Sequence, residues 1–337
     1  MSDSEAPYLV TGASGFIGGR LAARMAGDGR PVRGLVRASS DTAALTAAGV
    51  RLVRGELNDR ASLDAAVEGC GSVVHCAAMV SDWATVAEIR AANVTGTGNM
   101  LAAAARAGVR RFVHASTTDV YGHPAERGVQ EDFKGEGFAN WYAQSKLEAE
   151  DEVSRAARAG MTTVVLRPAT VYGPGSEDVI GEIAKAIRGG HMLLVARGRA
   201  IAGLCYVENL IDAILRSLDA DADAVAGRTF NVSDDLDVTW ARLTADLAAG
   251  LGARPPRLTL PYGPAAALAS ALEHGYRLLR RATGVSIPPL LSRQAVQVLG
   301  RDQDFSTAAL RDALGWQPRV DYEQGLTATL EWLVRRS

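Results

Sequence analysis

Several residue types are scarce in this chain, and each scarcity excludes a class of protein. The 337 residues include three cysteines (Cys70, Cys76 and Cys205) and no CxxC pair, so we expect buried thiols in a reducing compartment and no disulfide framework. The five histidines never occur as HxxxH or HExxH, so no metal site is expected. A formal net charge of −2 gives no general attraction for nucleic acid, and none is expected as a partner.

Long apolar runs are missing as well. No stretch of about 18 apolar residues occurs, so no transmembrane segment is expected. The acidic start, MSDSEAPYLV, lacks the basic and apolar regions of a signal peptide, and we therefore expect a cytoplasmic protein. The Ala/Leu-rich segment 261–283 has a basic end and could lie peripherally on a membrane, but we favour an amphipathic helix that covers a substrate pocket or another subunit.

What is present is an alternation of short β-branched runs and Ala-rich helical stretches. The runs fall at 8–12, 31–36, 50–55, 72–78, 111–116 and 162–168, with helix-like segments near 16–28, 61–68, 84–108 and 142–159. This pattern predicts βαβ units, and hence an α/β fold with a Rossmann-type, doubly wound parallel sheet. Further on, isolated strand signals occur at 193–195 and 228–232. We therefore expect a dinucleotide-binding domain over residues 1–170 and, over residues 171–337, a smaller C-terminal substrate-binding lobe from which some segments return to the sheet.

The first predicted strand leads into the glycine-rich sequence TGASGFIGG. Gly12, Gly15 and Gly18 lie between a strand signal and a helix signal, where a tight turn needs residues without a Cβ atom. The pyrophosphate of a dinucleotide can then approach backbone N–H groups and the positive end of the helix dipole. The loop predicts a dinucleotide site, with a purely structural turn as the alternative in a chain of 35 glycines.

The end of the second predicted strand bears on the choice of cofactor. An acidic residue there would bind the adenosine ribose and repel a 2′-phosphate, but the strand ends with Val36 and Arg37 and no acid. Arg37, helped by Ser39 or Ser40, could pair with a 2′-phosphate. We therefore favour NADP(H) over NAD(H); an Arg37 that only stacks on adenine from solvent is the alternative.

Lysine is the rare cation of this sequence. Only three of the 36 basic residues are lysines, and Lys146 follows Tyr142 by four residues in WYAQSKLEAE. On a helix, residues i and i+4 share a face, so the phenol and the ammonium are expected side by side. A free tyrosine has a pKa of about 10, and a neighbouring cation lowers it toward the range needed for proton transfer. Tyr142 is thus predicted to be a catalytic acid/base, and a surface tyrosine beside an ordinary lysine is the alternative.

With the glycine loop and the Tyr–Lys pair placed, the sequence resembles the extended short-chain dehydrogenase/reductase superfamily, of the NAD(P)-dependent epimerase/dehydratase type. The resemblance covers nearly the whole chain. Its landmarks occur in order: TGASGFIG (11–18), GELND (55–59), VVHCAA (73–78), NVTGTGNML (93–101), VHASTTDVYG (113–122), WYAQSKLEAE (141–150), LRPATVYGPG (166–175), YVENLIDAI (206–214) and LGWQP (314–318).

The resemblance implies roles for individual residues. Tyr142 would be the acid/base, Lys146 would lower its pKa and bind the nicotinamide ribose, and Thr117 would orient the substrate carbonyl, with Ser116 as the alternative donor. Asn93 would hold a helix kink and a water in the proton path. The other implied cofactor contacts are Gly12, Ser14, Gly15, Phe16, Ile17 and Gly18 in the glycine loop, Arg37, Glu56 and Leu57 beside adenine (the family usually has Asp for Glu56), Ala77 and Ala78 along phosphates and ribose, and Pro168, Ala169, Thr170 and Val171 at the carboxamide.

Within the superfamily the sequence looks closest to the 3β-hydroxysteroid dehydrogenase and dihydroflavonol reductase branch. Epimerase-like members usually carry Arg before the YV element to meet a diphosphate, whereas this chain has Leu204 and Cys205 there, although Arg197 and Arg199 are near. The implied function is hydride transfer between NAD(P)(H) and a ketone or secondary alcohol of a largely apolar small molecule. An NAD-dependent nucleotide-sugar epimerase is the first alternative. A non-catalytic cofactor sensor is the second, and the intact Tyr–Lys pair argues against it.

Two further expectations concern dehydration and assembly. Dehydratases need carboxylates just after the catalytic hydroxyl, and STTDVYG offers only Asp119, which we expect to point away from the substrate. Dehydration is therefore not expected. A homodimer through the helices near 84–108 and 142–159 is implied by the resemblance.

Overall fold

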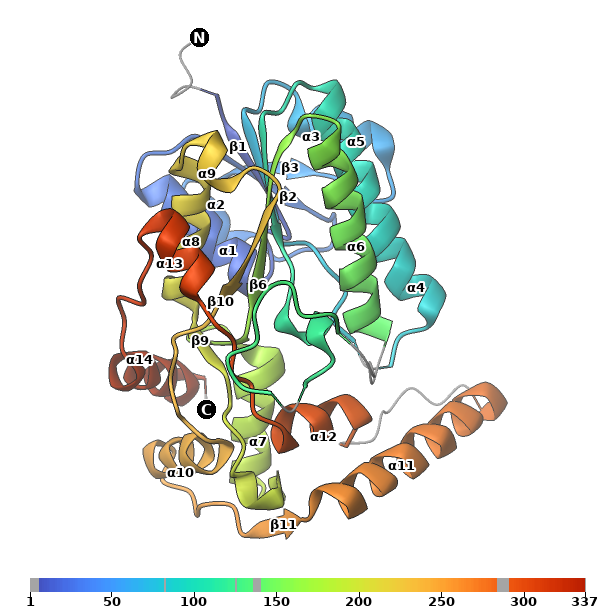
Figure 1. Cartoon of the computed structure of the whole chain (residues 1–337), viewed down its shortest axis with the longest axis vertical. Coiled ribbons are helices and arrows are strands. Elements are labelled where there is room, and N and C mark those ends of the chain that lie inside the picture. The colour runs from blue at the N-terminus through green and yellow to red at the C-terminus, as the bar shows by residue number, and fades with distance from the viewer. Residues whose placement is uncertain (1–5, 82, 125, 136–140, 284–290, 337) are drawn as a thin grey trace.

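The structure is a computed structural model that describes residues 6–81, 83–124, 126–135, 141–283 and 291–336 (Figure 1). The first five residues of the acidic start therefore lie outside the described ranges. A seven-stranded sheet forms its centre, with the strand order β3-β2-β1-β4-β5-β6-β10 and parallel pairing throughout. The strands are β1 (Tyr8–Thr11), β2 (Val32–Val36), β3 (Arg51–Arg54), β4 (Ser72–His75), β5 (Arg111–Ala115), β6 (Thr162–Pro168) and β10 (Arg228–Val232).

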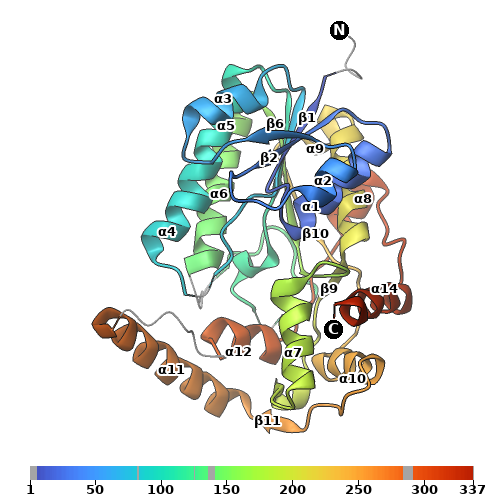
Figure 2. The same ribbon diagram turned by 180° about the vertical axis from the view of Figure 1, so that it is seen from behind.

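Helices cover both faces of this sheet (Figures 1 and 2). Alternate residues of a strand point to opposite faces. In β1, Val10 belongs to the apolar cluster under helices α1 (Phe16–Gly27) and α8 (Val207–Asp219). Leu9, its neighbour, belongs to the cluster under α3 (Arg60–Val67), α5 (Gly96–Arg106) and α6 (Trp141–Arg158). The sheet is therefore doubly wound, as predicted.

The helix predicted near 84–108 consists of three joined pieces. It begins at α4 (Val86–Arg90), where Thr85 and Glu88 form a reciprocal capping box that satisfies two backbone N–H groups. A π-helical turn, η1 (Ala91–Thr95), follows, and α5 continues the helix. Such a turn widens the backbone locally and is often found at functional sites.

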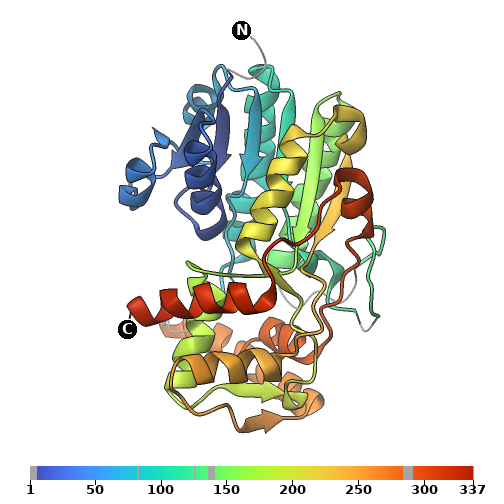
Figure 3. The same cartoon turned by 90° about the vertical axis from the view of Figure 1, so that its left-hand side faces the viewer.

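In the second half of the chain, β10 returns to the sheet beside β6 and α8 covers one of its faces, whereas most of the other elements build a smaller layer beyond the carboxyl ends of the strands (Figure 3). It contains two parallel strand pairs, β7 (Thr170–Tyr172) with β9 (Leu204–Tyr206) and β8 (Leu193–Val195) with β11 (Leu258–Leu260). The remaining helices are α2 (Ala43–Ala47), η2 (Thr118–Tyr121), η3 (Glu177–Gly181), α7 (Glu182–Arg188), η4 (Ala196–Gly198), α9 (Ala222–Val225), α10 (Trp240–Gly250), α11 (Tyr262–Thr283), α12 (Arg293–Gly300), α13 (Ala308–Leu314) and α14 (Tyr322–Arg335).

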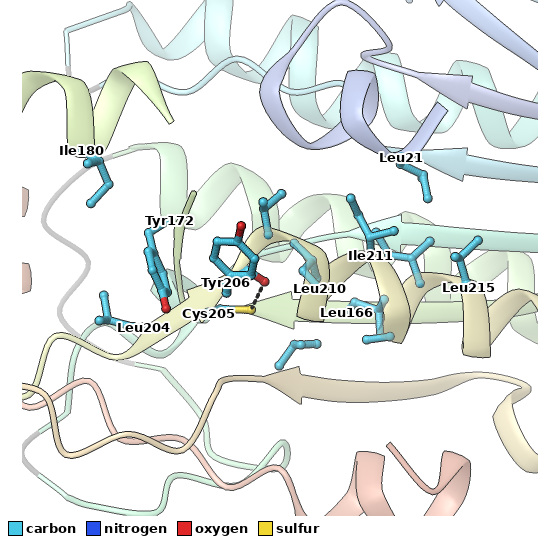
Figure 4. Close-up of a cluster of buried hydrophobic side chains, with 14 of the residues drawn as sticks. Leu21, Leu166, Tyr172, Ile180, Leu204, Cys205, Tyr206, Leu210, Ile211 and Leu215 are labelled. Atoms are coloured by element: carbon cyan, nitrogen blue, oxygen red, sulfur yellow. Dashed lines mark hydrogen bonds between the residues drawn. The ribbon is translucent and has the colours of Figure 1, made fainter. Parts of the chain in front are cut away.

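One apolar core joins the two halves. Figure 4 shows Leu210, Ile211 and Leu215 of α8 beside Leu166 of β6, and the same cluster continues to Tyr172 and Leu204 of the smaller layer. The burial of large apolar side chains across this junction opposes separation of the halves, because each would expose a hydrophobic face to water.

The structure confirms the predicted fold class, and each predicted β-branched run contains a strand. Cys70 and Cys205 are buried and Cys76 is half-buried, and all three are free thiols. No described helix is both long and apolar enough to span a bilayer. The expected boundary near residue 170 stays a prediction, because β10 belongs to the main sheet and the core is continuous.

Candidate functional site

A cavity of about 400 Å³ opens beyond the carboxyl ends of the central strands. In parallel α/β sheets, ligands bind at this edge where the strand order reverses, which here lies between β1 and β4. The cavity is lined by Gly12, Gly15, Phe16, Ile17, Gly18, Cys76, Ala78, Val80, Ser116, Thr117, Thr118, Asp119, Tyr142, Pro168, Ala169, Thr170, Val171, Ser176, Glu177, Asp178, Val179, Val298 and Gln303.

The glycine loop makes one wall of the cavity, as predicted, and its shape requires residues without side chains. Gly12 has φ +67°, and a Cβ atom there would lie 2.8 Å from the backbone nitrogen of Ala77. A Cβ atom on Gly18 would lie 2.8 Å from the carbonyl carbon of Gly12. The loop therefore packs backbone on backbone, and it presents the first turn of α1, from Phe16 onward, to the cavity. The N–H groups of this turn have no helical acceptor and suit an anionic group.

The residues predicted to meet adenosine lie at the ends of β2 and β3. Arg37 directly follows β2; its side chain is exposed and forms no ion pair with a described residue. Ser40 donates a hydrogen bond to Ser14 of the glycine loop (3.2 Å), so the Arg37 segment lies against that loop. Glu56 is exposed and Leu57 half-buried after β3. Arg37, Glu56 and Leu57 do not line the cavity, and their contacts with a cofactor stay a prediction.

Ala78 and residues 168–171 line the cavity, whereas Ala77 packs behind it against the glycine loop. Asn93 lies in the π-helical turn and is buried. Its side chain accepts a hydrogen bond from the Met79 amide (2.7 Å) and donates one to the Ser145 hydroxyl (2.9 Å). The structure thus gives Asn93 a bracing contact between the loop after β4 and helix α6, which the sequence did not predict.

Tyr142 lies in the first turn of α6, with its phenol in the cavity and the Thr117 hydroxyl within hydrogen-bond reach. Burial raises the pKa of the phenol well above its usual value, and the negative charge of Asp119 raises it further. The hydrogen bond from Thr117 acts in the opposite direction. The tyrosine and the hydroxyl that were predicted to act together are therefore adjacent.

Lys146 follows Tyr142 by one turn of the same helix, and its ammonium group contacts strand β5. Its ammonium group is buried and donates to the carbonyl oxygen of Ala115 (2.6 Å) and to Nε2 of His114 (3.2 Å). Burial lowers the pKa of Lys146 to about 8, and the charge of Glu150 opposes this change. The effect of Lys146 on the pKa of Tyr142 stays a prediction; the contacts that the structure shows for the ammonium group are those with strand β5.

His114, which the sequence analysis did not single out, accepts the lysine's hydrogen bond in its neutral form. Its pKa is held well below the usual value by burial, and next by the charge of Lys146. Its ring stacks on His75 (centroids 5.5 Å apart), which hydrogen-bonds to the Thr11 hydroxyl (2.8 Å). Both histidines lie inside β-strands, where the alternation of the sequence predicts core residues, so no local signal separated them from packing residues.

Ser116, the alternative donor, is engaged elsewhere. Its hydroxyl donates to Glu150, a buried carboxylate that also forms a two-pronged ion pair with Arg167 (2.6 and 3.1 Å). This network holds β5, β6 and α6 together. Thr117 therefore fits the substrate-orienting role better than Ser116 does.

Asp119 differs from its prediction. Instead of pointing away, it lines the same cavity as Tyr142, because the 3-10 turn η2 brings it over the end of β5. Oδ1 of Asp119 lies 3.4 Å from Nε2 of His123, a buried histidine with φ +56°. Nδ1 of His123 donates to Oε1 of Gln303 (2.9 Å), and Nε2 is 2.9 Å from Nε2 of Gln294. His123 and Gln303 are separated by 180 residues, so no motif revealed this cluster.

The charged residues that line the cavity are all acidic among the residues the structure describes. Glu177 and Asp178 are exposed, and Glu177 pairs with Arg336, whereas Asp119 is partly buried. Arg197 and Arg199, which the sequence left as candidates for phosphate binding, do not line this cavity.

Helix α11, predicted as a pocket wall, contributes no described residue to the cavity that contains Tyr142. It borders a second cavity of about 570 Å³, where the ring of Tyr276 meets Trp83 edge-on at 5.0 Å. Four leucines of the helix are exposed to solvent: Leu268, Leu272, Leu278 and Leu279. Contact with a membrane or with another subunit stays a prediction.

The model of the NAD dependent epimerase/dehydratase family matches residues 8–233, from β1 to the end of β10. The chain belongs to that family. As an extended short-chain dehydrogenase/reductase it is an NAD(P)-dependent oxidoreductase, and the resemblance found in the sequence is confirmed.

Relatives with known activities align over almost the entire chain. The 4-hydroxy-2-methyl-3-oxo-4-farnesyl-3,4-dihydroquinoline-1-oxide ketoreductase of Stigmatella aurantiaca is 32% identical over 95% of this chain and 94% of that protein. A 2-alkyl-3-oxoalkanoate reductase of Stenotrophomonas maltophilia is 31% identical, covering 94% and 96%. A 3 beta-hydroxysteroid dehydrogenase/Delta 5-->4-isomerase of Mycobacterium tuberculosis is 31% identical, covering 97% and 90%.

Solved structures of the family share the fold. UDP-glucose 4-epimerase from Thermotoga maritima superposes with a TM-score of 0.79, covering 98% of this chain and 99% of that one, at 20% identity. The family implies a nicotinamide dinucleotide as cofactor. The glycine loop has no room for a Cβ atom at Gly12 or Gly18, and the N–H groups at the start of α1 lie behind it. This arrangement fits such a dinucleotide.

Proposed function

We propose that this member of the family transfers hydride between NADP(H) and a ketone, or the corresponding secondary alcohol, of a largely apolar small molecule. One observation carries the proposal. The Tyr142 phenol and the Thr117 hydroxyl meet in a cavity whose described lining is mostly apolar and contains no lysine or arginine. A substrate that depends on phosphate or diphosphate recognition would find no cationic partner there.

The residues of the cavity suit proton delivery to a carbonyl oxygen. When bound, the nicotinamide supplies the hydride. Since its pKa is raised, Tyr142 is protonated at neutral pH and can donate its proton to the oxygen as negative charge develops there. The Thr117 hydroxyl stabilises the same oxygen.

Lys146 would act from behind the phenol. Two of its three N–H donors are used by Ala115 and His114. We assign the third to a ribose hydroxyl of the cofactor. In this scheme the lysine fixes the cofactor, and burial, the charge of Asp119 and the Thr117 hydroxyl act on the pKa of the phenol.

A nucleotide-sugar epimerase is the second candidate, and the shared fold is what favours it. Two observations weigh against it. The cavity lining lacks cations among the described residues, and the two relatives named as ketone reductases align over nearly the full chain. The exposed Arg37 beside the glycine loop favours NADP(H) as the cofactor.

The test asks whether the enzyme consumes NADPH in a net reduction of a ketone or returns the hydride to a sugar without net consumption of cofactor. Steroid, flavonoid and acyl ketones would be screened with NADPH by the loss of absorbance of the reduced nicotinamide. UDP-glucose with catalytic NAD would be followed by proton NMR. Stoichiometric NADPH consumption with a ketone is the expected result. Interconversion of the sugar epimers without net NADPH loss, and no turnover of any ketone, would refute the proposal.

A further inference from the structure

The substrate side of the cavity contains one partly buried carboxylate close to the reacting groups. Asp119 lies two residues after Thr117, in η2, and its backbone amide donates to the Thr117 hydroxyl (3.2 Å). Its charge acts directly on the Tyr142 phenol. Any group of a substrate that lies beside the reacting carbonyl is therefore exposed to the negative field of this carboxylate.

A buried histidine, His123, lies beside Asp119 and is held by two glutamines of the C-terminal layer. His123 occupies the left-handed region with φ +56°, a conformation that strains a non-glycine residue and persists only when its surroundings hold it. Its Nδ1–H donates to Oε1 of Gln303, and its Nε2 accepts from the amide of Gln294. These contacts hold His123 between η2 and the C-terminal layer, and Nε2 of its ring lies 3.4 Å from Oδ1 of Asp119.

The other charges at the cavity have the same sign or lie at its mouth. Glu177 and Asp178 are exposed, and no described lysine or arginine lines the cavity. A carboxylate or phosphate on the substrate would therefore meet a like charge in the cavity, where no described lysine or arginine lines the wall; the Lys146 ammonium is hydrogen-bonded to Ala115 and His114 instead. A hydroxyl or amide N–H at the same place would meet a hydrogen-bond acceptor.

We propose that Asp119 selects substrates by their charge. The site takes uncharged ketones, in particular those with a hydroxyl beside the carbonyl, and it rejects ketones with a carboxylate close to the reacting carbon. The proposal rests on the reductase function proposed above and narrows its substrate class. Of the chemistries named for the relatives, it favours a neutral hydroxyketone over a 3-oxoalkanoate.

The experiment uses substrates that differ only in charge. A 2-alkyl-3-oxoalkanoate and its methyl ester carry the same ketone, and kcat/KM for NADPH oxidation would be measured for both with the wild type and Asp119→Asn. We expect the wild type to prefer the ester by on the order of 10–100-fold, and Asp119→Asn to reduce that ratio about tenfold or more. Asp312→Asn is the matched control, because it removes an exposed charge of α13 that does not line the cavity, and it should change the ratio less than about twofold.

A binding measurement separates this proposal from the reductase proposal. Decanoate and decanamide would be titrated calorimetrically into the protein with NADP⁺ present. A preference of the wild type for decanamide that is lost in Asp119→Asn supports charge selection, even if no ketone is turned over. The absence of ketone turnover would then count against the reductase function alone. Equal wild-type affinities, or a preference that survives in Asp119→Asn, would overturn charge selection even if ketones are reduced.

Discussion

The two sides of the cavity are built in different ways. The cofactor side comes from short motifs directly after β1, β4 and β6, and much of its surface is backbone. The substrate side joins Asp119 with Val298 and Gln303, which lie about 180 residues further along the chain. A backbone wall fixes one shape and tolerates no added atom, whereas a wall of side chains from separate segments can change its charge and size one residue at a time. The predictions below test whether changes on the two sides have these different consequences.

The largest effect is expected at Tyr142, where the two sides meet. Tyr142→Phe removes the proton donor but keeps the ring, so kcat should fall by on the order of 10³-fold while NADPH affinity changes little. Steady-state rates and a fluorescence titration of NADPH give the two values. Tyr276→Phe, which removes a phenol on α11 outside this cavity, is the control and should keep its turnover. A Tyr142→Phe enzyme with near-wild-type kcat would show that the acid lies elsewhere.

A methyl group on the backbone wall should have the next largest effect. Gly18→Ala brings a Cβ atom against the Gly12 carbonyl group, so the loop must move and cofactor affinity should fall by about 100-fold. Gly27→Ala lies on the same helix with nothing within 4 Å of the new atom. It should bind cofactor normally and gain about 0.5 kcal/mol of unfolding free energy. Calorimetric binding and urea unfolding measure both, and equal affinities for the two variants would contradict the backbone-wall interpretation.

The difference between the two sides also decides how much the sequence alone could predict. The strands, the helices and the glycine loop are local, because apolar alternation and missing side chains appear in neighbouring residues. The predicted strands and helices are confirmed, and the glycine loop forms the tight turn between β1 and α1. Tyr142 and Thr117 were found through motifs, and the structure places them together.

Contacts between residues that are far apart in the sequence gave no such local signal. Spacing predicted that Lys146 shares a helix face with Tyr142, but it did not reveal the carbonyl and the imidazole of strand β5 that accept hydrogen bonds from its ammonium group. Asp119 was placed wrongly because the direction of a residue in a four-residue 3-10 turn depends on the turn's path over β5. The partners of His123 come from α12 and the segment after it, and only the tertiary structure brings them near.

Lys146 lies behind both sides, and its burial predicts a pH-dependent stability. Its pKa of about 8 in the folded protein is below the ordinary 10.5, so the unfolded chain holds this proton more tightly. The contribution of Lys146 to the free energy of unfolding should therefore rise between pH 8 and pH 10.5, by up to about 3 kcal/mol. Urea unfolding of the wild type and Lys146→Met across this range would give a difference that increases with pH.

Lys185→Met provides the matched control for that measurement. Lys185 is exposed and pairs with Glu182, which raises its pKa, so its removal should leave the pH dependence below pH 10.5 nearly unchanged. Parallel curves for the wild type and Lys146→Met would mean that the ammonium is hydrated in solution, and that the contact with His114 does not describe its surroundings.

The smallest effect is expected at Arg37, on the rim of the cofactor side. The guanidinium is exposed, so its pairing with a 2′-phosphate would be partly screened, and Arg37→Ala should lower the preference for NADPH over NADH by about tenfold. Arg51→Ala removes another exposed arginine, at the first position of β3 and thus at the other edge of the sheet, and should keep the preference. The Arg37 effect should also shrink as salt rises from 0.05 to about 0.5 M, because an ion pair at the surface is screened whereas stacking on adenine is not. A loss of affinity that is equal for NADPH and NADH and insensitive to salt would assign Arg37 to stacking, and would leave the choice of cofactor to residues on the wall itself.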